Sequence, residues 1–273
     1  MTISLKDIGR ELGLELTYQG GRLRTSPLVT ETYYHQLAWR RSLSINSSFC
    51  QALVGAGYLT WQQMLDAVVR FRLGRCLGNA VIFWQINQEE RICDGKVMFY
   101  APDCHRRKEK QFDPTWVSAL LLRRQGGKLA NDITRHCFFG LHQLSEKLPS
   151  FSLPPTGEYH APLIAIVESE KTAVILSAYY PQYIWLASGG LGEVQVEKFR
   201  PLRGRKIILF PDTDLEGKAY QHWYQAAQNV MAQPFWEDSP PIRVSAILEQ
   251  HATPDQKRRK IDLADYVTEN KNH

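Results

Sequence analysis

Residues 206–217 read KIILFPDTDLEG, an apolar run that ends in two aspartates spaced two apart, with a glycine three residues later. A second apolar run, LIAIVESEKTA at 163–173, ends in Glu168. Continuous apolar runs of this length are typical of strands covered on both faces, as in a parallel sheet with helices on each side. We therefore expect the second half of the chain to be α/β.

The same half of the chain alternates further strand and helix patterns. We expect strands at 183–187 and 243–247, and helices at 173–178 and 217–231. This alternation is typical of parallel strands, because a parallel pair needs a crossover that is usually a helix.

Three acidic residues follow the ends of two expected strands, and these are Glu168, Asp212 and Asp214. Functional groups in open α/β sheets collect at the carboxyl ends of the strands, so we expect these carboxylates to converge. Like charges at short range repel, and a bound cation relieves the repulsion. Oxygen-only ligands favour Mg²⁺ or Mn²⁺, the ions commonly used for phosphoryl transfer.

A second acidic pair, Asp262 and Asp265, lies in KIDLADYV after the fourth expected strand. The pair either reaches the same cation or lies at a helix N-terminus, where the helix dipole favours acidic residues. The residues alone leave both readings open.

Taken in order, VESEKTA (167–173), SGG (188–190), LFPDTDLEG (209–217) and DLAD (262–265) resemble the Toprim domain. That domain is shared by bacterial-type primases, type IA and type II topoisomerases and several nucleases. The resemblance covers about residues 160–268 and implies the residue roles. Asp212 and Asp214 look like Mg²⁺ ligands, Glu168 like the general acid/base or a further ligand, and Asp262 and Asp265 like the acidic pair of the primase-like branch. Ser169 stands where the family usually has glycine.

The first half of the chain resembles the basic subdomain that precedes Toprim in primases. The resemblance rests on a strand pair with a basic end at 81–110 and on CFFGLHQL at 137–144. The resemblance is strongest to small primase-like proteins of bacterial mobile elements. The N-terminal zinc ribbon of the primase family is absent from this sequence. Four prolines within 149–162 mark a boundary. We therefore expect a mixed α+β subdomain at 1–155 and a Toprim domain at 160–273.

Basic residues cluster in the first half and are expected to contact nucleic acid, because phosphate contacts release counterions without regard to base sequence. These are Arg106, Arg107, Lys108, Lys110, Arg123, Arg124, Lys128 and Arg135. The nearby aromatic residues Trp84, Phe99 and Tyr100 either stack on single-stranded bases or pack in the core, and we favour the core.

Composition limits the class of protein. The chain has 273 residues, of which 44% are apolar and 22% charged, and a formal net charge of +5, which fits a globular fold. Its five cysteines form no C-x-x-C pair, so we expect neither a disulfide framework nor a zinc ribbon. No apolar run reaches membrane-spanning length. We expect a cytoplasmic protein without membrane contact.

The resemblance implies an Mg²⁺- or Mn²⁺-dependent, primase-like nucleotidyltransferase. Its partners would be single-stranded DNA and nucleoside triphosphates, with a helicase as a further partner. Two alternatives stay open: a Toprim nuclease in repair or defence, and a non-enzymatic nucleic-acid-binding accessory. A structural α/β domain with solvated carboxylates is the remaining reading, and the position of the acids at strand ends weighs against it.

Overall fold

The computed structural model describes residues 42–120, 136–145 and 162–270, together with residue 40 and the short strands β1 (Tyr18–Gln19) and β2 (Arg22–Leu23). The chain divides into two compact units, Met1–Cys137 and Phe138–His273. The division falls before the proline-rich stretch at which the sequence placed it, so that residues 138–145 belong to the second unit. The spacing of apolar residues also predicts a short helix at 5–12, which lies outside the described residues.

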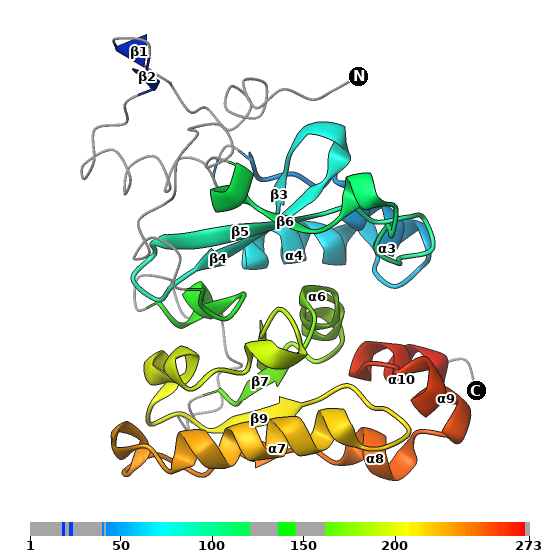
Figure 1. Ribbon diagram of the computed structural model, residues 1–273. Helices are drawn as coiled ribbons and strands as arrows, with labels where there is room; N and C mark the ends of the chain where they lie inside the picture. Colours follow the sequence, from blue (N-terminus) through cyan, green and yellow to red (C-terminus); the bar gives the residue numbers. More distant parts are fainter. Residues whose placement is uncertain are drawn as a thin grey trace. The chain divides into compact units, whose positions relative to one another are not determined.

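The first unit contains a four-stranded antiparallel sheet with the order β3-β4-β5-β6. Its described elements are α3 (Ser48–Gly55), α4 (Trp61–Phe71), β3 (Gly74–Arg75), β4 (Val81–Ile86), β5 (Ile92–Met98) and β6 (Thr115–Trp116). Helix α4 starts with a capping box, which the sequence T-W-Q-Q at 60–63 predicts and in which Thr60 and Gln63 satisfy each other's backbone amides. Its buried residues are Met64, Ala67, Val68 and Phe71, and the helix lies along the sheet (Figure 1).

Aromatic side chains fill the core of this unit. Trp84 is buried, and its indole N–H donates to Ser42 Oγ over 2.9 Å. Phe83 and Tyr100 pack edge to face, and both contact Phe49. The prediction that Trp84 and Tyr100 pack in the core is therefore confirmed, and Phe99 packs against the same sheet.

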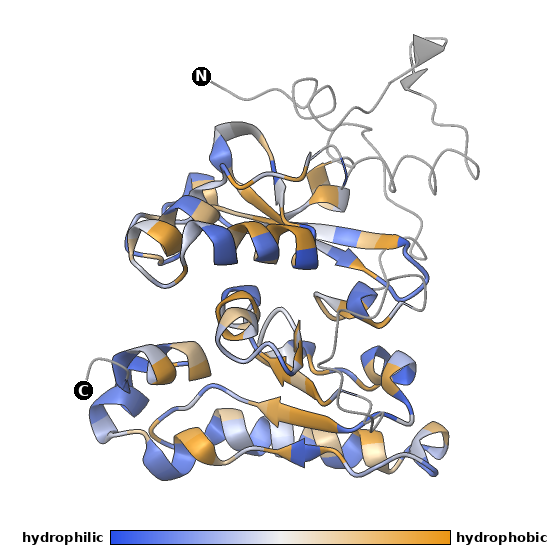
Figure 2. Cartoon of the chain, turned by 180° about the vertical axis from the view of Figure 1, so that it is seen from behind, coloured by the Kyte–Doolittle hydropathy of each residue, from blue (hydrophilic) through white to orange (hydrophobic). Residues whose placement is uncertain are grey.

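The second unit contains a four-stranded parallel sheet, so the expected α/β class is confirmed. Its strands and α-helices are β7 (Ile164–Val167), α6 (Glu170–Tyr179), β8 (Ile184–Ala187), β9 (Ile207–Phe210), α7 (Lys218–Met231), β10 (Arg243–Val244), α8 (Ile247–His251), α9 (Pro254–Arg259) and α10 (Leu263–Asn270). Figure 2 shows the central strands as mainly hydrophobic and the outer helices as carrying many hydrophilic residues.

The strand order is β10-β9-β7-β8, which places a topological switch point between β7 and β9. The chain moves from β7 outward to β8 through α6, and from β9 outward in the other direction to β10 through α7. Right-handed crossovers then put α6 and α7 on opposite faces of the sheet, as Figure 1 shows. In sheets of this kind, ligands bind outside the carboxyl ends of the strands at the switch point.

Short 3₁₀ helices complete the described chain. They are Leu77–Asn79, Lys110–Phe112, Leu141–Leu144, Leu191–Glu193, Val196–Leu202 and Pro234–Trp236. Over residues 42–120, 136–145 and 162–270, no helix combines the length and apolar character needed to cross a membrane.

Two predicted elements differ from the structure. The strand expected at 243–247 ends at Val244, because the chain leaves the edge of the sheet there and α8 begins at Ile247. The sequence also predicts a helical segment at 137–147, but its described part contains only the 3₁₀ turn Leu141–Leu144. Before that turn, Phe139 forms an antiparallel bridge with Ala187, so its backbone bonds to β8.

Candidate active site at the switch point

Glu168 and Asp212 leave the two central strands of the parallel sheet at the same edge. Strands β7 and β9 are paired in register with Val167 opposite Phe210, so Glu168 and Asp212 lie one and two residues beyond this pair. A glycine amide fixes the backbone at Glu168, since Gly189 N–H donates to the Glu168 carbonyl over 2.9 Å. The SGG turn, which the sequence analysis did not assign, therefore holds the end of β7.

Asp212 lies among other carboxylates. Burial raises the pKa of Asp212 well above its ordinary value, and the negative charges of Asp262, Glu168 and Asp265 raise it further. Lys171 acts in the opposite direction. The structure thus brings four of the five predicted acids into one electrostatic cluster, in which a negative charge on Asp212 is strongly disfavoured.

Asp214, the fifth acid, is bonded to the start of α7. Its Oδ1 accepts from the N–H groups of Glu216 and Lys218 over 2.9 and 3.1 Å, and its Oδ2 accepts from Ala219 over 2.8 Å. Burial acts to raise the pKa of Asp214, but these backbone donors outweigh it and hold the pKa below the ordinary value. Asp214 therefore has a structural role at the N-terminus of α7, whatever else it binds.

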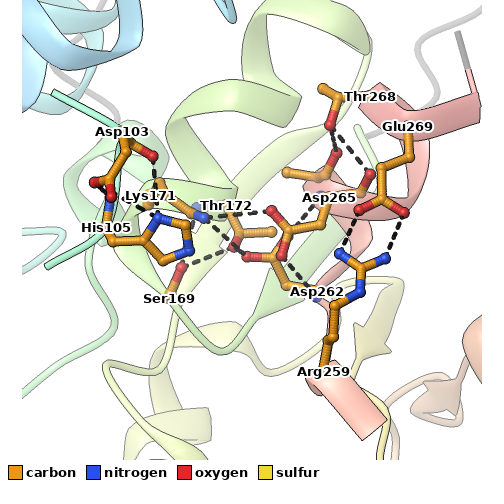
Figure 3. Close-up of polar contacts among 11 residues, drawn as sticks. Asp103, His105, Ser169, Lys171, Thr172, Arg259, Asp262, Asp265, Thr268 and Glu269 are labelled. Atoms are coloured by element: carbon orange, nitrogen blue, oxygen red, sulfur yellow. Dashed lines mark hydrogen bonds and ion pairs between the residues drawn. The ribbon is translucent and has the colours of Figure 1, made fainter. Parts of the chain in front are cut away.

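Asp262 and Asp265 begin helix α10. The Asp262 Oδ1 accepts from the Asp265 N–H over 2.8 Å, and the Asp265 Oδ2 accepts from the Asp262 N–H over 3.3 Å. The hydroxyl of Thr172 donates to Asp262 Oδ2 over 2.6 Å, which joins α10 to α6 (Figure 3). The prediction that this pair lies at a helix N-terminus is thus correct. The charges of the pair also raise the pKa of Asp212.

A contact that the sequence analysis missed holds the loop between the two aspartates of PDTD. Thr213 is buried, and its hydroxyl donates to Glu249 Oε1 on α8 over 2.6 Å. The Lys257 ammonium donates to Glu249 Oε2 over 3.2 Å, and Thr213 N–H donates to the Ile261 carbonyl. No sequence signal marks Glu249, because it lies 36 residues beyond Thr213 in an ordinary helix.

Among the residues that the structure describes, no group of three or more His, Cys, Asp or Glu side chains is arranged to hold a metal ion. Mg²⁺ needs less than this, because it keeps several waters and is commonly held by one or two carboxylates together with substrate phosphates. Glu168 and Asp212 follow adjacent strands at one edge of the sheet, which gives this edge the number of carboxylates that such a site uses. Burial and the neighbouring carboxylates disfavour a negative charge on Asp212, and a cation bound at this edge would relieve that effect.

The basic segment of the first unit follows β5. Arg106 forms an antiparallel bridge with Tyr100, and the side chains of Arg106, Lys108 and Lys110 are exposed. Arg107 differs, since its guanidinium lies 3.5 Å from the Phe112 ring centroid and pairs with Glu109 over 2.7 Å. The other predicted basic residues, Arg123, Arg124, Lys128 and Arg135, lie outside the described residues.

The fold and the acids define a class: a two-unit protein with a parallel α/β sheet and carboxylates at its switch point. The chain belongs to the family described as Domain of unknown function (DUF6371), whose model matches residues 47–213. No curated protein matches it.

Two solved structures are similar to the chain. The DnaG catalytic core has a TM-score of 0.47 at 13% identity, covering 88% of this chain and 77% of that one. The primase fragment of the bacteriophage T7 primase-helicase protein has a TM-score of 0.38 at 16% identity, covering 68% of this chain and 66% of that one.

Proposed function

We propose that the protein is an Mg²⁺-dependent, primase-like nucleotidyltransferase of bacterial or mobile-element origin that acts on single-stranded DNA. One observation carries the proposal: Glu168 and Asp212 leave adjacent central strands at the switch point, and neighbouring carboxylates disfavour the charge on Asp212. A cluster of this kind attracts a divalent cation, and Mn²⁺ fits the same oxygen ligands. The Toprim resemblance of the sequence agrees with this proposal.

In the proposed reaction, the 3′-oxygen of one nucleotide bonds to the α-phosphorus of a nucleoside triphosphate, and pyrophosphate leaves. Glu168 accepts the hydroxyl proton as general base, a role that typically contributes about 10²–10⁴-fold to the rate. Glu168 and Asp212 would hold Mg²⁺, which would neutralise charge on the phosphates. Asp214 keeps acceptor capacity on Oδ2 and is proposed as a further ligand.

We propose that the exposed side chains of Arg106, Lys108 and Lys110 bind the DNA backbone. Their charges are sequence-blind, so binding should weaken steeply as the salt concentration rises. Arg123, Arg124, Lys128 and Arg135 are proposed as further residues that bind DNA. A helicase is proposed as the protein partner.

The test uses the full chain with Mg²⁺, labelled single-stranded DNA and nucleoside triphosphates. The wild type should extend the label, whereas Asp212→Asn and Glu168→Gln should lose about 10²-fold or more of this activity. Asp238→Asn is the matched control, because Asp238 is exposed and lies in a different part of the unit. It should keep full activity.

The products also separate the competing functions. Shortened rather than lengthened DNA, lost in the same two variants, would replace the primase proposal with a nuclease at the same site. DNA binding without any conversion and without divalent-ion binding by calorimetry would support the non-enzymatic accessory. Primer synthesis that survives Asp212→Asn would refute the site.

A further inference from the structure

Lys171 lies in the first turn of α6 and extends into the carboxylate cluster. Its ammonium is 3.4 Å from Asp265 Oδ1 and 3.7 Å from Asp262 Oδ2, and the side chain is 17% exposed. Figure 3 shows the ammonium directed at these two carboxylates. A cation in the first turn of a helix is placed against the helix dipole, so the two acids must supply the compensating attraction.

Asp262 and Asp265 form hydrogen bonds at the junction of α6 and α10. Asp262 accepts from Thr172 on one oxygen and from the Asp265 amide on the other. Asp265 accepts from the Asp262 amide on the oxygen that does not face Lys171. Every carboxylate oxygen of the pair therefore has a partner within the protein, and each of these partners is a donor.

We propose that Lys171 is the fixed cation of the cluster, which offsets one of the two negative charges of Asp262 and Asp265 so that the site takes a single divalent ion at Glu168 and Asp212. This inference rests on the proposed function, since it concerns the same metal. It assigns Lys171 as a positioning residue that sets the number of ions. It also assigns Asp262 and Asp265 to the α6–α10 junction rather than to metal coordination.

The positions of the charges support the division of roles. Lys171 is the cation that lies against both Asp265 and Asp262. Without its charge, Asp262 and Asp265 would face Asp212 uncompensated, and the cluster would attract more divalent charge. A permanent ammonium cannot be lost by dilution or chelation, in contrast to a bound metal ion.

The experiment counts Mn²⁺ bound to the full chain without nucleotide, by isothermal titration calorimetry and by electron paramagnetic resonance of free Mn²⁺. Wild type should bind one ion. Lys171→Gln should bind two, or one with at least about tenfold higher affinity, because a unit of compensating charge is lost. Lys171→Arg should behave as wild type. Arg259→Gln is the matched control, because Arg259 pairs with Glu269 on α10 without entering the cluster.

Asp265→Asn provides a second variant that keeps Lys171, in case Lys171→Gln does not fold. It should still bind one ion, with an affinity lowered by no more than about tenfold, because one negative charge near the site is lost but no ligand is. Loss of Mn²⁺ binding in Asp265→Asn would overturn the inference.

The remaining outcomes separate the inference from the proposed function. Two ions in wild type, or an unchanged single ion in a folded Lys171→Gln, would overturn the role of Lys171 and leave the metal-dependent function standing. No Mn²⁺ binding in wild type would overturn the proposed metal site and the inference with it.

Discussion

Thr213 donates a 2.6 Å hydrogen bond to Glu249, and this contact joins the loop between Asp212 and Asp214 to helix α8. Lys257 on α9 donates to the same carboxylate. The loop that carries both aspartates is therefore fixed by residues that follow it by several elements. A rigid loop matters at such a site, because ligand side chains must be held close to their working geometry.

Glu249→Ala should destabilise the protein and weaken Mn²⁺ binding. It leaves the buried Thr213 hydroxyl without its acceptor and Lys257 without its carboxylate, which should cost about 1–3 kcal/mol of unfolding free energy. Urea denaturation and calorimetric Mn²⁺ titration measure the two effects. Glu249→Gln keeps an oxygen for Thr213 and should lose less.

A double-mutant cycle tests whether the effect passes through Thr213. Glu249→Ala in a Thr213→Val background should cost clearly less than in wild type, because the bond is already removed. Fully additive losses of stability and of Mn²⁺ affinity would show that Glu249 does not position the loop.

Asp212→Asn and Asp214→Asn should change stability in opposite directions in metal-free protein at neutral pH. The raised pKa of Asp212 means that folding disfavours its charge, so the neutral asparagine should raise Tm by roughly 2–4 °C, the shift that about 1 kcal/mol gives in a chain of this size. Asp214→Asn should lower Tm by a similar amount, because a charged acceptor of three backbone amides is lost.

Differential scanning calorimetry with and without Mg²⁺ measures this contrast. Mg²⁺ should raise the Tm of wild type and should have little effect on Asp212→Asn, because a ligand that binds only the folded state stabilises it. A lower Tm for metal-free Asp212→Asn would show that the Asp212 carboxylate stabilises the fold, contrary to the charge clustering described above.

The parallel sheet could be predicted from the sequence because its signal is local. The runs at 163–167 and 206–210 are continuous and apolar, and their acids follow directly, so the strand ends and Glu168 and Asp212 were predicted together. The capping box at Thr60 and Gln63 is equally local, since both partners lie within one turn.

The rest depends on contacts between residues far apart in the sequence. Thr213 and Glu249 have no shared pattern, and the role of Asp262 depends on Thr172, 90 residues earlier. Strand β10 is short because it lies at the sheet edge, where Arg243 is exposed and the apolar pattern no longer reports on pairing. Such features follow from tertiary packing, which a single sequence does not display.

Cys50 should make the protein lose stability at alkaline pH. Burial raises the pKa of the Cys50 thiol from 9.0 to about 11, against smaller opposing effects from Ser47. Below pH 9 both states keep the proton. Between about pH 9 and 11 the unfolded chain releases it and the folded chain does not, so stability falls by about 2–3 kcal/mol as pH rises.

Urea denaturation at pH 8 and pH 10.5 measures this loss. Other groups also titrate there, so the comparison is between variants: Cys50→Ala should be less stable at pH 8 but should fall less steeply with pH. Cys93→Ala should change the slope in the opposite direction, because a hydrogen bond from Cys137 lowers the pKa of Cys93, so that the contribution of Cys93 to stability rises with pH. Equal slopes for wild type and Cys50→Ala would contradict the assignment to Cys50.

Gly95 should be intolerant of even one added methyl group. It lies in β5 opposite Trp84, and a Cβ atom at this position would lie 2.8 Å from Ile82 Cγ2 and 2.8 Å from Trp84 Cε3. Both neighbours are buried in the same core, and Trp84 is also held by its hydrogen bond to Ser42. Overpacking of this kind typically costs about 1–3 kcal/mol, so Gly95→Ala should lower the unfolding free energy by that amount.

Gly55→Ala is the control, because Gly55 is the last residue of α3 and a Cβ there meets nothing within 4 Å. Alanine favours helix over glycine by roughly 0.5–1 kcal/mol, so this variant should be as stable as wild type or slightly more stable. Urea denaturation of the two variants compares the same substitution in packed and open surroundings. If Gly95→Ala matches Gly55→Ala in stability, then Trp84 can move aside, and the contact between β4 and β5 is looser than its distances indicate.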